Sequence, residues 1–316
     1  MRAVRIAGWG QAPVVEECPA PVRAPGEALL RLRATSVNPV DLAIASGRFY
    51  GETPDPPFVL GAEAVGEVVE SDRWPAGTRA WCLTTTGAFG EFFAAREDAL
   101  VPVPDGISDE LAAALGIAGL AGWMSVVERG GVQAGETVLV LGASGVVGQV
   151  AVQAARLRGA GLVVAAARTR EGQERALSLG AHRFVALEDG ADVAAAFREA
   201  CAPGADLVID MLWGAPLQAA LGAGRARARF VQVGNAAGAT ATITGGALRG
   251  GRFDIRGFSV FTERPEDLER AYSELAAAAA AGSVAVQVES LRLAEAPIAW
   301  ARQAVGTAGR KLVLVP

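Results

Sequence analysis

The stretch Thr137–Gln153 constrains the fold of this chain more than any other part of its sequence. The apolar run Val138–Leu141 has the composition of a buried strand, and a glycine-rich turn and a helical pattern follow it directly. In the pattern Ala143-x-Gly145-x-x-Gly148, small residues permit a tight turn and a close backbone approach to a pyrophosphate, which the amino end of a helix attracts. The stretch predicts a dinucleotide site, with a purely structural turn as the alternative. The residues expected to contact the cofactor are Ser144, Gly145, Val146 and Val147.

Strand and helix patterns alternate along the residues around and after this stretch. The predicted strands are Val138–Leu141, Leu162–Ala167, Arg183–Leu187, Asp206–Asp210, Arg229–Val233 and Asp254–Phe258. Amphipathic helices are expected at Val146–Arg158 and Arg170–Leu179, and a long alanine-rich helix at Pro265–Ala281. Six strands with helical crossovers predict an α/β fold with a doubly wound parallel sheet.

The two ends of the chain have a different pattern. From Met1 to about Asp105, short apolar runs are separated by Pro and Gly, which predicts an irregular, mainly antiparallel β domain. Residues 284–316 again suggest a strand, a helix and a strand that return to this first domain. We therefore expect a first domain over residues 1–112, a dinucleotide-binding domain over 113–262, and the long helix with the returning segment over 263–316.

Composition excludes several classes of function. The chain has 29 basic and 34 acidic residues and no basic block, so neither nucleic acid nor an anionic membrane is an expected partner. The first residues show no apolar signal segment, which predicts a cytoplasmic protein. Three scattered cysteines do not form a disulfide framework or a structural zinc site. A single histidine, His182, argues against hydrolase chemistry of the Ser-His or Cys-His kind.

The end of the second predicted strand distinguishes the two nicotinamide cofactors. An NAD site places a carboxylate there for the ribose hydroxyls, whereas the 2′-phosphate of NADPH requires cations and no carboxylate. Ala167 occupies the acidic position and is followed by Arg168 and Thr169. This favours NADPH, with Arg168 holding the phosphate and Thr169 donating a hydroxyl hydrogen. The alternative is that these are solvated loop residues.

Several motifs together carry a family resemblance. They are Gly135-Glu-x-x-Leu139 continuing through Gln153-x-x-Arg156, Val37-Asn-Pro-Val-Asp41, Gly61-x-Glu63-x-x-Gly66, Leu179-Gly-Ala181, Val233-Gly-Asn235 and Arg310-Lys-Leu-Val-Leu. Over essentially its whole length the chain resembles a zinc-free medium-chain dehydrogenase/reductase of the quinone oxidoreductase type, although Val146 stands where a second glycine is usual. The resemblance implies a Rossmann domain joined to a GroES-like catalytic domain.

The resemblance also bears on metal and substrate. Zinc-dependent members of the superfamily bind a catalytic metal at positions that correspond to Asn38, Ala62 and Ile117, and none of these side chains can ligate zinc. We therefore expect no metal site. Without a Lewis acid, hydride transfer is easiest to an activated acceptor, such as a quinone or an α,β-unsaturated carbonyl compound.

Further site residues follow from the resemblance and from strand ends. Asn38 is expected near the nicotinamide ribose or the substrate, with an Asx turn before Pro39 as the alternative. Asp41 is expected to be an N-cap of the next short helix, with a catalytic acid as the alternative. Tyr50 would donate to a developing enolate oxygen, or simply pack among aromatic side chains. The remaining cofactor candidates are Leu212, Gly234 and Asn235 at strand ends, and Lys311, which would reach a phosphate or be solvated.

The sequence thus predicts NADPH-dependent reduction of quinones or enones without a metal ion. Two alternatives remain open: a reductase dedicated to one enoyl or enone metabolite of a biosynthetic pathway, and a non-catalytic NADPH-binding protein. The last strand of the parallel sheet, beginning at Asp254, is apolar enough to be an unsafe free edge. We therefore expect a homodimer joined at that edge.

Overall fold

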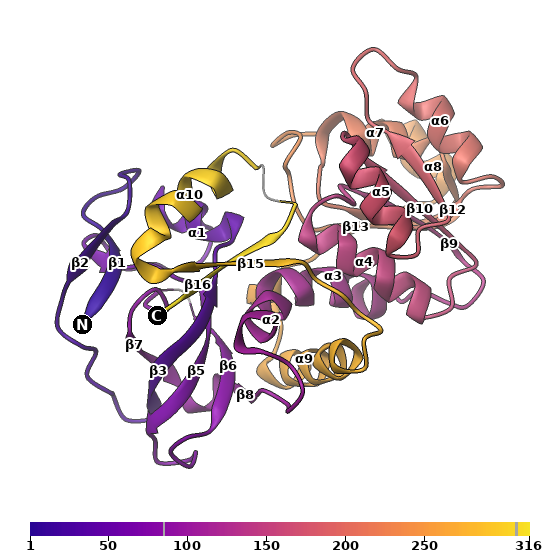
Figure 1. Ribbon diagram of the computed structural model, residues 1–316. Helices are drawn as coiled ribbons and strands as arrows, with labels where there is room; N and C mark the ends of the chain where they lie inside the picture. The colour runs from indigo at the N-terminus through magenta and orange to yellow at the C-terminus, as the bar shows by residue number, and fades with distance from the viewer. Residues whose placement is uncertain (85, 307–308) are drawn as a thin grey trace. The chain divides into compact units, whose positions relative to one another are not determined.

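The computed structural model describes residues 1–84, 86–306 and 309–316, and the chain divides into two compact units (Figure 1). The first unit comprises Met1–Ala118, Arg264–Ala281 and Val286–Pro316. The second comprises Gly119–Glu263 and Gly282–Ala285. Each unit is built from segments that are distant in the sequence, because the carboxyl-terminal part of the chain returns to the first unit.

A six-stranded parallel sheet forms the centre of the second unit. Its strands are β9 (Thr137–Leu141), β10 (Leu162–Ala167), β11 (Arg183–Ala186), β12 (Ala205–Asp210), β13 (Gly224–Gln232) and β14 (Asp254–Gly257). They lie in the order β11-β10-β9-β12-β13-β14, with parallel pairing throughout. This is the predicted doubly wound order, in which the chain starts at the centre and moves outward twice.

Helices and short helical turns precede, connect and follow these strands. They are α3 (Leu120–Met124), η3 (Ser125–Arg129), α4 (Val146–Leu157), α5 (Arg170–Ser178), α6 (Val193–Ala200), α7 (Gly214–Leu221), α8 (Gly245–Gly251) and η4 (Val260–Thr262). Every residue of β9 is buried, as expected for a central strand that helices cover on both faces. Leu139, Val164, Val208 and Phe230 belong to the core on one face of the sheet.

The first unit contains two sheets that are mainly antiparallel, which confirms the predicted fold class. Its strands are β1 (Arg2–Ile6), β2 (Val14–Glu17), β3 (Glu27–Ser36), β4 (Phe58–Val59), β5 (Glu63–Glu70), β6 (Arg79–Leu83), β7 (Phe92–Arg96), β8 (Leu100–Pro102), β15 (Val288–Arg292) and β16 (Lys311–Val315). One sheet has the order β2-β1-β4, and the other has the order β15-β16-β3-β5-β6-β8, with β7 on β3. Strand β16 pairs with β3 through Val313 and Ser36, so the last strand completes a sheet begun near the amino terminus.

The helical segments of the first unit include a long one that fits the prediction. They are α1 (Pro39–Ala45), η1 (Glu97–Ala99), α2 (Asp109–Ala114), η2 (Leu115–Gly119), α9 (Pro265–Ala280), η5 (Leu293–Glu295) and α10 (Ala296–Ala304). Helix α9 buries Leu268, Tyr272 and Leu275 on one face. The Tyr272 ring stacks on Trp81 at 4.8 Å between centroids, and its hydroxyl donates to the Ala112 carbonyl at 2.9 Å.

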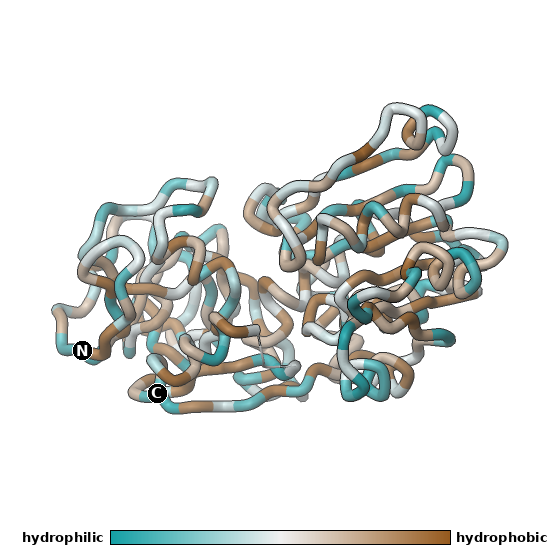
Figure 2. The backbone as a smooth tube through the Cα atoms, turned by 90° about the horizontal axis from the view of Figure 1, so that it is seen from above, coloured by the Kyte–Doolittle hydropathy of each residue, from teal (hydrophilic) through white to brown (hydrophobic). Residues whose placement is uncertain are grey.

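Apolar segments lie mostly inside each unit. Figure 2 shows brown, apolar stretches running through both units and teal, hydrophilic stretches on peripheral loops and helices. One helical run in the described part of the chain, Asp109–Arg129, is long and apolar enough by composition to cross a membrane. Because 78% of its most apolar window is buried inside the protein, it has the character of a core helix.

Candidate functional site

The glycine-rich turn between β9 and α4 has the predicted geometry. Gly142 has a positive φ of 86°, a conformation that favours glycine. A Cβ atom at Gly148 would lie 2.5 Å from the Gly142 carbonyl oxygen, so only glycine lets the helix approach the strand this closely. At Gly145, the N-cap of α4, the nearest atom to such a Cβ would be 3.7 Å away. The backbone at Gly145 is therefore bare and approachable.

The first turn of α4 offers backbone donors. Val146 and Val147 are its first two residues, and N–H groups there have no acceptor within the helix. Behind the turn, the buried Gln149 side chain donates from Nε2 to the Ser144 carbonyl at 2.8 Å. The turn is thus held in place while its donors stay available. Contact of these residues with a cofactor remains a prediction.

The end of β10 lies against this turn. Ala167, the last residue of the strand, is buried, and Arg168 and Thr169 after it are exposed. A Cβ atom at Gly172, in the first turn of α5, would be 2.6 Å from the Ser144 Cβ, so α5 begins directly beside the glycine turn. Thr169 is the N-cap of α5, and its Oγ1 accepts from the Gly172 N–H at 3.1 Å.

The two arginines after β10 are in different electrostatic situations. Arg170 forms an ion pair with Glu174 at 3.0 Å. Arg168 has no hydrogen bond or ion pair with any residue that the structure describes. The Arg168 guanidinium is therefore available to an anionic ligand, with no carboxylate at the end of the strand to repel it.

The loops after β12 and β13 reach the same edge of the sheet. The Met211 carbonyl accepts from the Ala236 N–H at 3.2 Å, and a Cβ atom at Gly142 would lie 3.2 Å from Leu212 Cδ2. Gly234 packs closely against the Met211 backbone, and Asn235 is exposed. The predicted residues Leu212, Gly234 and Asn235 therefore lie at one edge with the glycine turn.

A buried polar network occupies the first unit, centred on Glu63. Its Oε1 accepts from Asn38 Nδ2 at 2.8 Å, and its Oε2 accepts from Trp81 Nε1 at 3.0 Å and from the Ile117 N–H at 2.6 Å. Burial raises the pKa of this carboxyl, while Lys311 and these donors oppose the shift. Gly116 has to be glycine here, because a Cβ atom would lie 1.8 Å from Glu63 Oε2.

Lys311 supplies the cation of this network. It is only 4% exposed, and its Nζ donates to the Val37 carbonyl at 3.0 Å and to Asn38 Oδ1. Burial lowers the pKa of the ammonium group, and the charges of Glu63 and Asp41 counteract this. The expectation that Lys311 is solvated is wrong, because β16 directs its side chain into the unit. Its contact with a cofactor phosphate remains a prediction.

Asp41 also belongs to the network, and its position differs from the prediction. It is the third residue of α1 rather than the N-cap, which is Asn38. Its Oδ2 accepts from the Asn38 N–H at 2.7 Å, and its Oδ1 accepts from the Ala62 N–H at 3.0 Å. Burial raises the pKa of this carboxyl to about 7. Pro39 at the first helical position fixes the start of α1 and so places Asp41 within its first turn.

The network fixes the orientation of the Asn38 amide. A lysine ammonium can only donate, so the Asn38 atom that faces Lys311 is Oδ1. The two hydrogens of Nδ2 then go to the Ser36 carbonyl at 3.2 Å and to Glu63. One lone pair of Oδ1 remains. Asn38 is therefore better suited to accept from a hydroxyl group than to donate to an oxyanion.

Tyr50 lies at the surface of the first unit. Its side chain is 70% exposed, and its ring contacts that of Phe49 at 4.7 Å between centroids. This matches the aromatic packing considered for it. Its role as a proton donor stays a prediction.

The residues at the positions that ligate zinc in other members of the superfamily lie close together, next to the Glu63 and Asp41 carboxyl groups. The Ala62 N–H donates to Asp41, and the Ile117 N–H donates to Glu63. Their side chains are apolar, and Lys311 already supplies a cation next to Asn38. No group of three or more His, Cys, Asp or Glu that suits a metal ion occurs among the described residues. The residues present do not fit a zinc ion.

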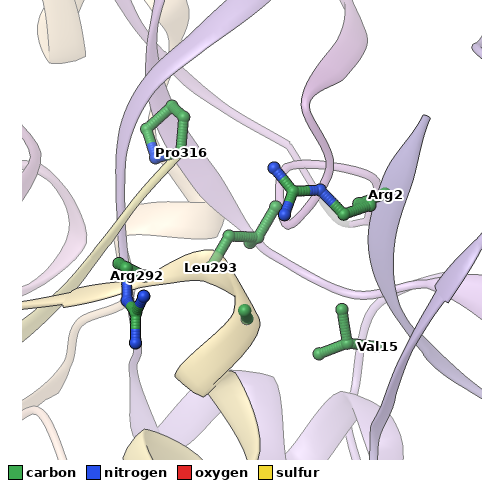
Figure 3. Close-up of a pocket in the computed structure, with 6 residues that line it drawn as sticks. Arg2, Val15, Arg292, Leu293 and Pro316 are labelled. Atoms are coloured by element: carbon green, nitrogen blue, oxygen red, sulfur yellow. The ribbon is translucent and has the colours of Figure 1, made fainter.

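A separate small cavity of about 130 Å³ lies in the first unit (Figure 3). Arg2, Val15, Arg292, Leu293, Ala294 and Pro316 line it. Both arginines are paired, Arg2 with Glu91 at 2.8 Å and Arg292 with Glu295 at 3.1 Å. The cavity shares no residue with the predicted site.

Sequence reasoning missed the way Lys311, Asp41 and Glu63 combine. A signal was present, because Lys311 is the only lysine in a chain with 28 arginines. A compact ammonium group fits a small buried site where the wide guanidinium fork does not. The one lysine among the basic residues therefore indicated a buried site that a guanidinium group does not fit.

Two family models match the chain. A model described as an alcohol dehydrogenase GroES-like domain matches residues 24–105, and one described as a zinc-binding dehydrogenase matches residues 146–278. A protein of Mus musculus named quinone oxidoreductase is 34% identical over 191 residues, which cover 58% of this chain. The match spans 57% of the length of that curated relative.

Solved structures share the fold over the whole chain. The quinone oxidoreductase of Thermus thermophilus, solved alone and in complex with NADPH, is 28% identical with a TM-score of 0.82, and both chains are covered completely. A mycobacterial protein solved with NADPH is 25% identical with a TM-score of 0.88, again over 100% of both chains. With both family models matched and quinone oxidoreductases among its relatives and structural neighbours, the chain belongs to the medium-chain dehydrogenases/reductases of the quinone oxidoreductase type.

Proposed function

We propose that this protein catalyses NADPH-dependent reduction of quinones or α,β-unsaturated carbonyl compounds by hydride transfer, without a metal ion. The observation that carries the proposal is the edge formed by the glycine turn and the end of β10, where Arg168 is unpaired among the described residues and no carboxylate stands at Ala167. Two structural neighbours solved with NADPH support the same cofactor.

The residues of this edge have distinct roles in the proposal. The N–H groups of Val146 and Val147 would hold the pyrophosphate, and the Arg168 guanidinium would bind the 2′-phosphate. Thr169 uses its oxygen to cap α5, which leaves its hydroxyl hydrogen to donate to the same phosphate. When bound, NADPH supplies the hydride.

Side chains of the first unit support this acceptor class. Hydride addition to an activated double bond moves charge to a carbonyl oxygen, which neutral hydrogen-bond donors can stabilise. Tyr50 is the proposed donor to this oxygen, because its side chain is exposed. Asn38 is proposed to accept from a hydroxyl group of the cofactor ribose or the substrate through the remaining lone pair of Oδ1.

A cofactor-turnover screen tests the proposal. Purified protein and NADPH are incubated with quinones, enones and simple aldehydes while NADPH absorbance is followed. We expect NADPH oxidation with quinones or enones. Tight NADPH binding without oxidation by any acceptor would instead support a non-catalytic NADPH-binding protein.

A homodimer is proposed at the free edge of the parallel sheet. Strand β14 is the last strand of that sheet as described, paired only with β13, so one side of its backbone lacks ladder partners. Two copies related by a two-fold axis would pair these edges. Light scattering during gel filtration is expected to give twice the 32.3 kDa of one chain. A mass of one chain at micromolar concentration would contradict it.

A further inference from the structure

Asp210 is a buried residue whose carboxylate accepts hydrogen bonds from the backbone of one short turn. It is the last residue of β12 and is fully buried. Its Oδ1 accepts from two backbone N–H groups, those of Leu212 at 2.8 Å and Trp213 at 2.9 Å. Its Oδ2 is also buried and has no hydrogen-bond partner among the residues that the structure describes. A buried carboxyl oxygen without a hydrogen bond carries a free-energy cost, which the two bonds to Oδ1 only partly offset.

The turn that Asp210 holds is strained. Trp213 has φ 58° and ψ −163°, and Gly214 has φ 59°. The first conformation is one that glycine adopts and other residues avoid. Such a conformation persists only where neighbouring bonds impose it, and such sites often bind ligands. The two N–H groups that donate to Asp210 belong to the strained residue, Trp213, and to the residue before it, Leu212.

This turn organises its neighbours at the edge of the sheet. The Leu212 carbonyl accepts from the Ala237 N–H at 2.8 Å, which ties the loop after β13 to the turn. Leu212 also packs against Gly142 of the glycine turn. One carboxylate therefore sets the mutual positions of three loops, those after β9, β12 and β13.

The geometry points to Asp210 as a positioning residue for the nicotinamide half of the cofactor. In a doubly wound sheet the two halves of a dinucleotide lie on opposite sides of the central strand β9. Arg168, after β10, lies on the side of the adenosine phosphate, and the turn after β12 lies on the other side. This inference rests on the proposed NADPH binding and adds that Asp210 governs one half of that site.

Binding of NADPH is compared with binding of 2′,5′-ADP, which carries only the adenosine half, by isothermal titration calorimetry. We expect Asp210→Ala to raise the Kd for NADPH by about tenfold or more, because two bonds to a charged acceptor are lost. The Kd for 2′,5′-ADP should stay within about twofold. Asp210→Asn keeps an acceptor oxygen for the turn, so its Kd for NADPH should stay within about threefold of the wild type.

Asp206→Ala is the matched control. Asp206 lies in the same strand, and its carboxylate also accepts from a backbone N–H, that of Thr137 at 2.9 Å, but at the opposite end of the sheet. The Kd of the Asp206→Ala variant for NADPH should equal that of the wild type. If Asp210→Ala does not fold, Asp210→Ser, which keeps one small acceptor, should show the same selective loss for NADPH.

These measurements distinguish the role of Asp210 from the proposed binding of NADPH itself. Unchanged NADPH binding by Asp210→Ala and Asp210→Ser, or equal weakening of NADPH and 2′,5′-ADP binding in them, would overturn the positioning role while leaving NADPH binding intact. A wild-type protein that binds neither ligand would overturn the proposed function, and this inference with it.

Discussion

Replacement of Lys311 by methionine is expected to lower the free energy of unfolding by about 3 kcal/mol, because two buried oxygen atoms lose their hydrogen-bond donor. The substitution takes away the only cation in contact with this network within the described residues and leaves Glu63 and Asp41 uncompensated. It also leaves the Val37 carbonyl without a donor. Urea unfolding followed by circular dichroism measures the change.

A second substitution tests the cause of that loss. Once the ammonium is gone, the Asn38 amide can turn over, so that Oδ1 faces position 63. Glu63→Gln then removes a charge and provides an NH2 group for that oxygen. We expect the double variant Lys311→Met, Glu63→Gln to regain part of the lost stability.

Arg170→Met is the control for the loss of a positive charge. Arg170 pairs with Glu174 on the solvent-exposed surface, so its removal should change the unfolding free energy by no more than about 0.5 kcal/mol. If Lys311→Met were as stable as Arg170→Met, the network would not have the structural importance that its burial indicates.

Arg168→Ala is expected to remove most of the preference for NADPH over NADH. A charge-assisted contact with the 2′-phosphate contributes about 1.5–3 kcal/mol, or roughly 10- to 150-fold in the ratio of the two dissociation constants. Only NADPH binding should weaken, because NADH has no phosphate at that position. Fluorescence titration with both cofactors measures the ratio.

The neighbouring arginine supplies the comparison. Arg170→Ala removes the same charge two residues further on, but Arg170 is already engaged by Glu174. Its effect on the NADPH preference should be several times smaller. Equal affinity of the wild type for both cofactors would refute the assignment of Arg168.

The sequence was most informative where structure depends on local patterns. The strand, turn and helix from Thr137 to Leu157 form as predicted, because the apolar run, the glycines and the helical periodicity all lie within about twenty residues. The parallel order of the sheet followed from helical crossovers between strands. The long helix α9 also forms as predicted, because alanine has a high helix propensity.

The buried network could not be predicted in the same way. Lys311 meets Asn38 across 273 residues of sequence, and no local pattern specifies such a contact. The burial of Lys311 depends on the pairing of β16 with β3, which is a tertiary event. Gly116 shows the same limitation, because its need for glycine arises from Glu63, more than fifty residues earlier.

The proposed reaction is hydride transfer from NADPH to an activated acceptor without a metal ion. Its most direct test is steady-state turnover of a quinone and of an α,β-unsaturated ketone with NADPH, in the presence of a metal chelator, with the product identified. We expect NADPH oxidation that the chelator does not affect, with reduction of the quinone or of the C=C bond of the ketone. Loss of activity in chelator, or oxidation of simple alcohols at a comparable rate, would contradict it.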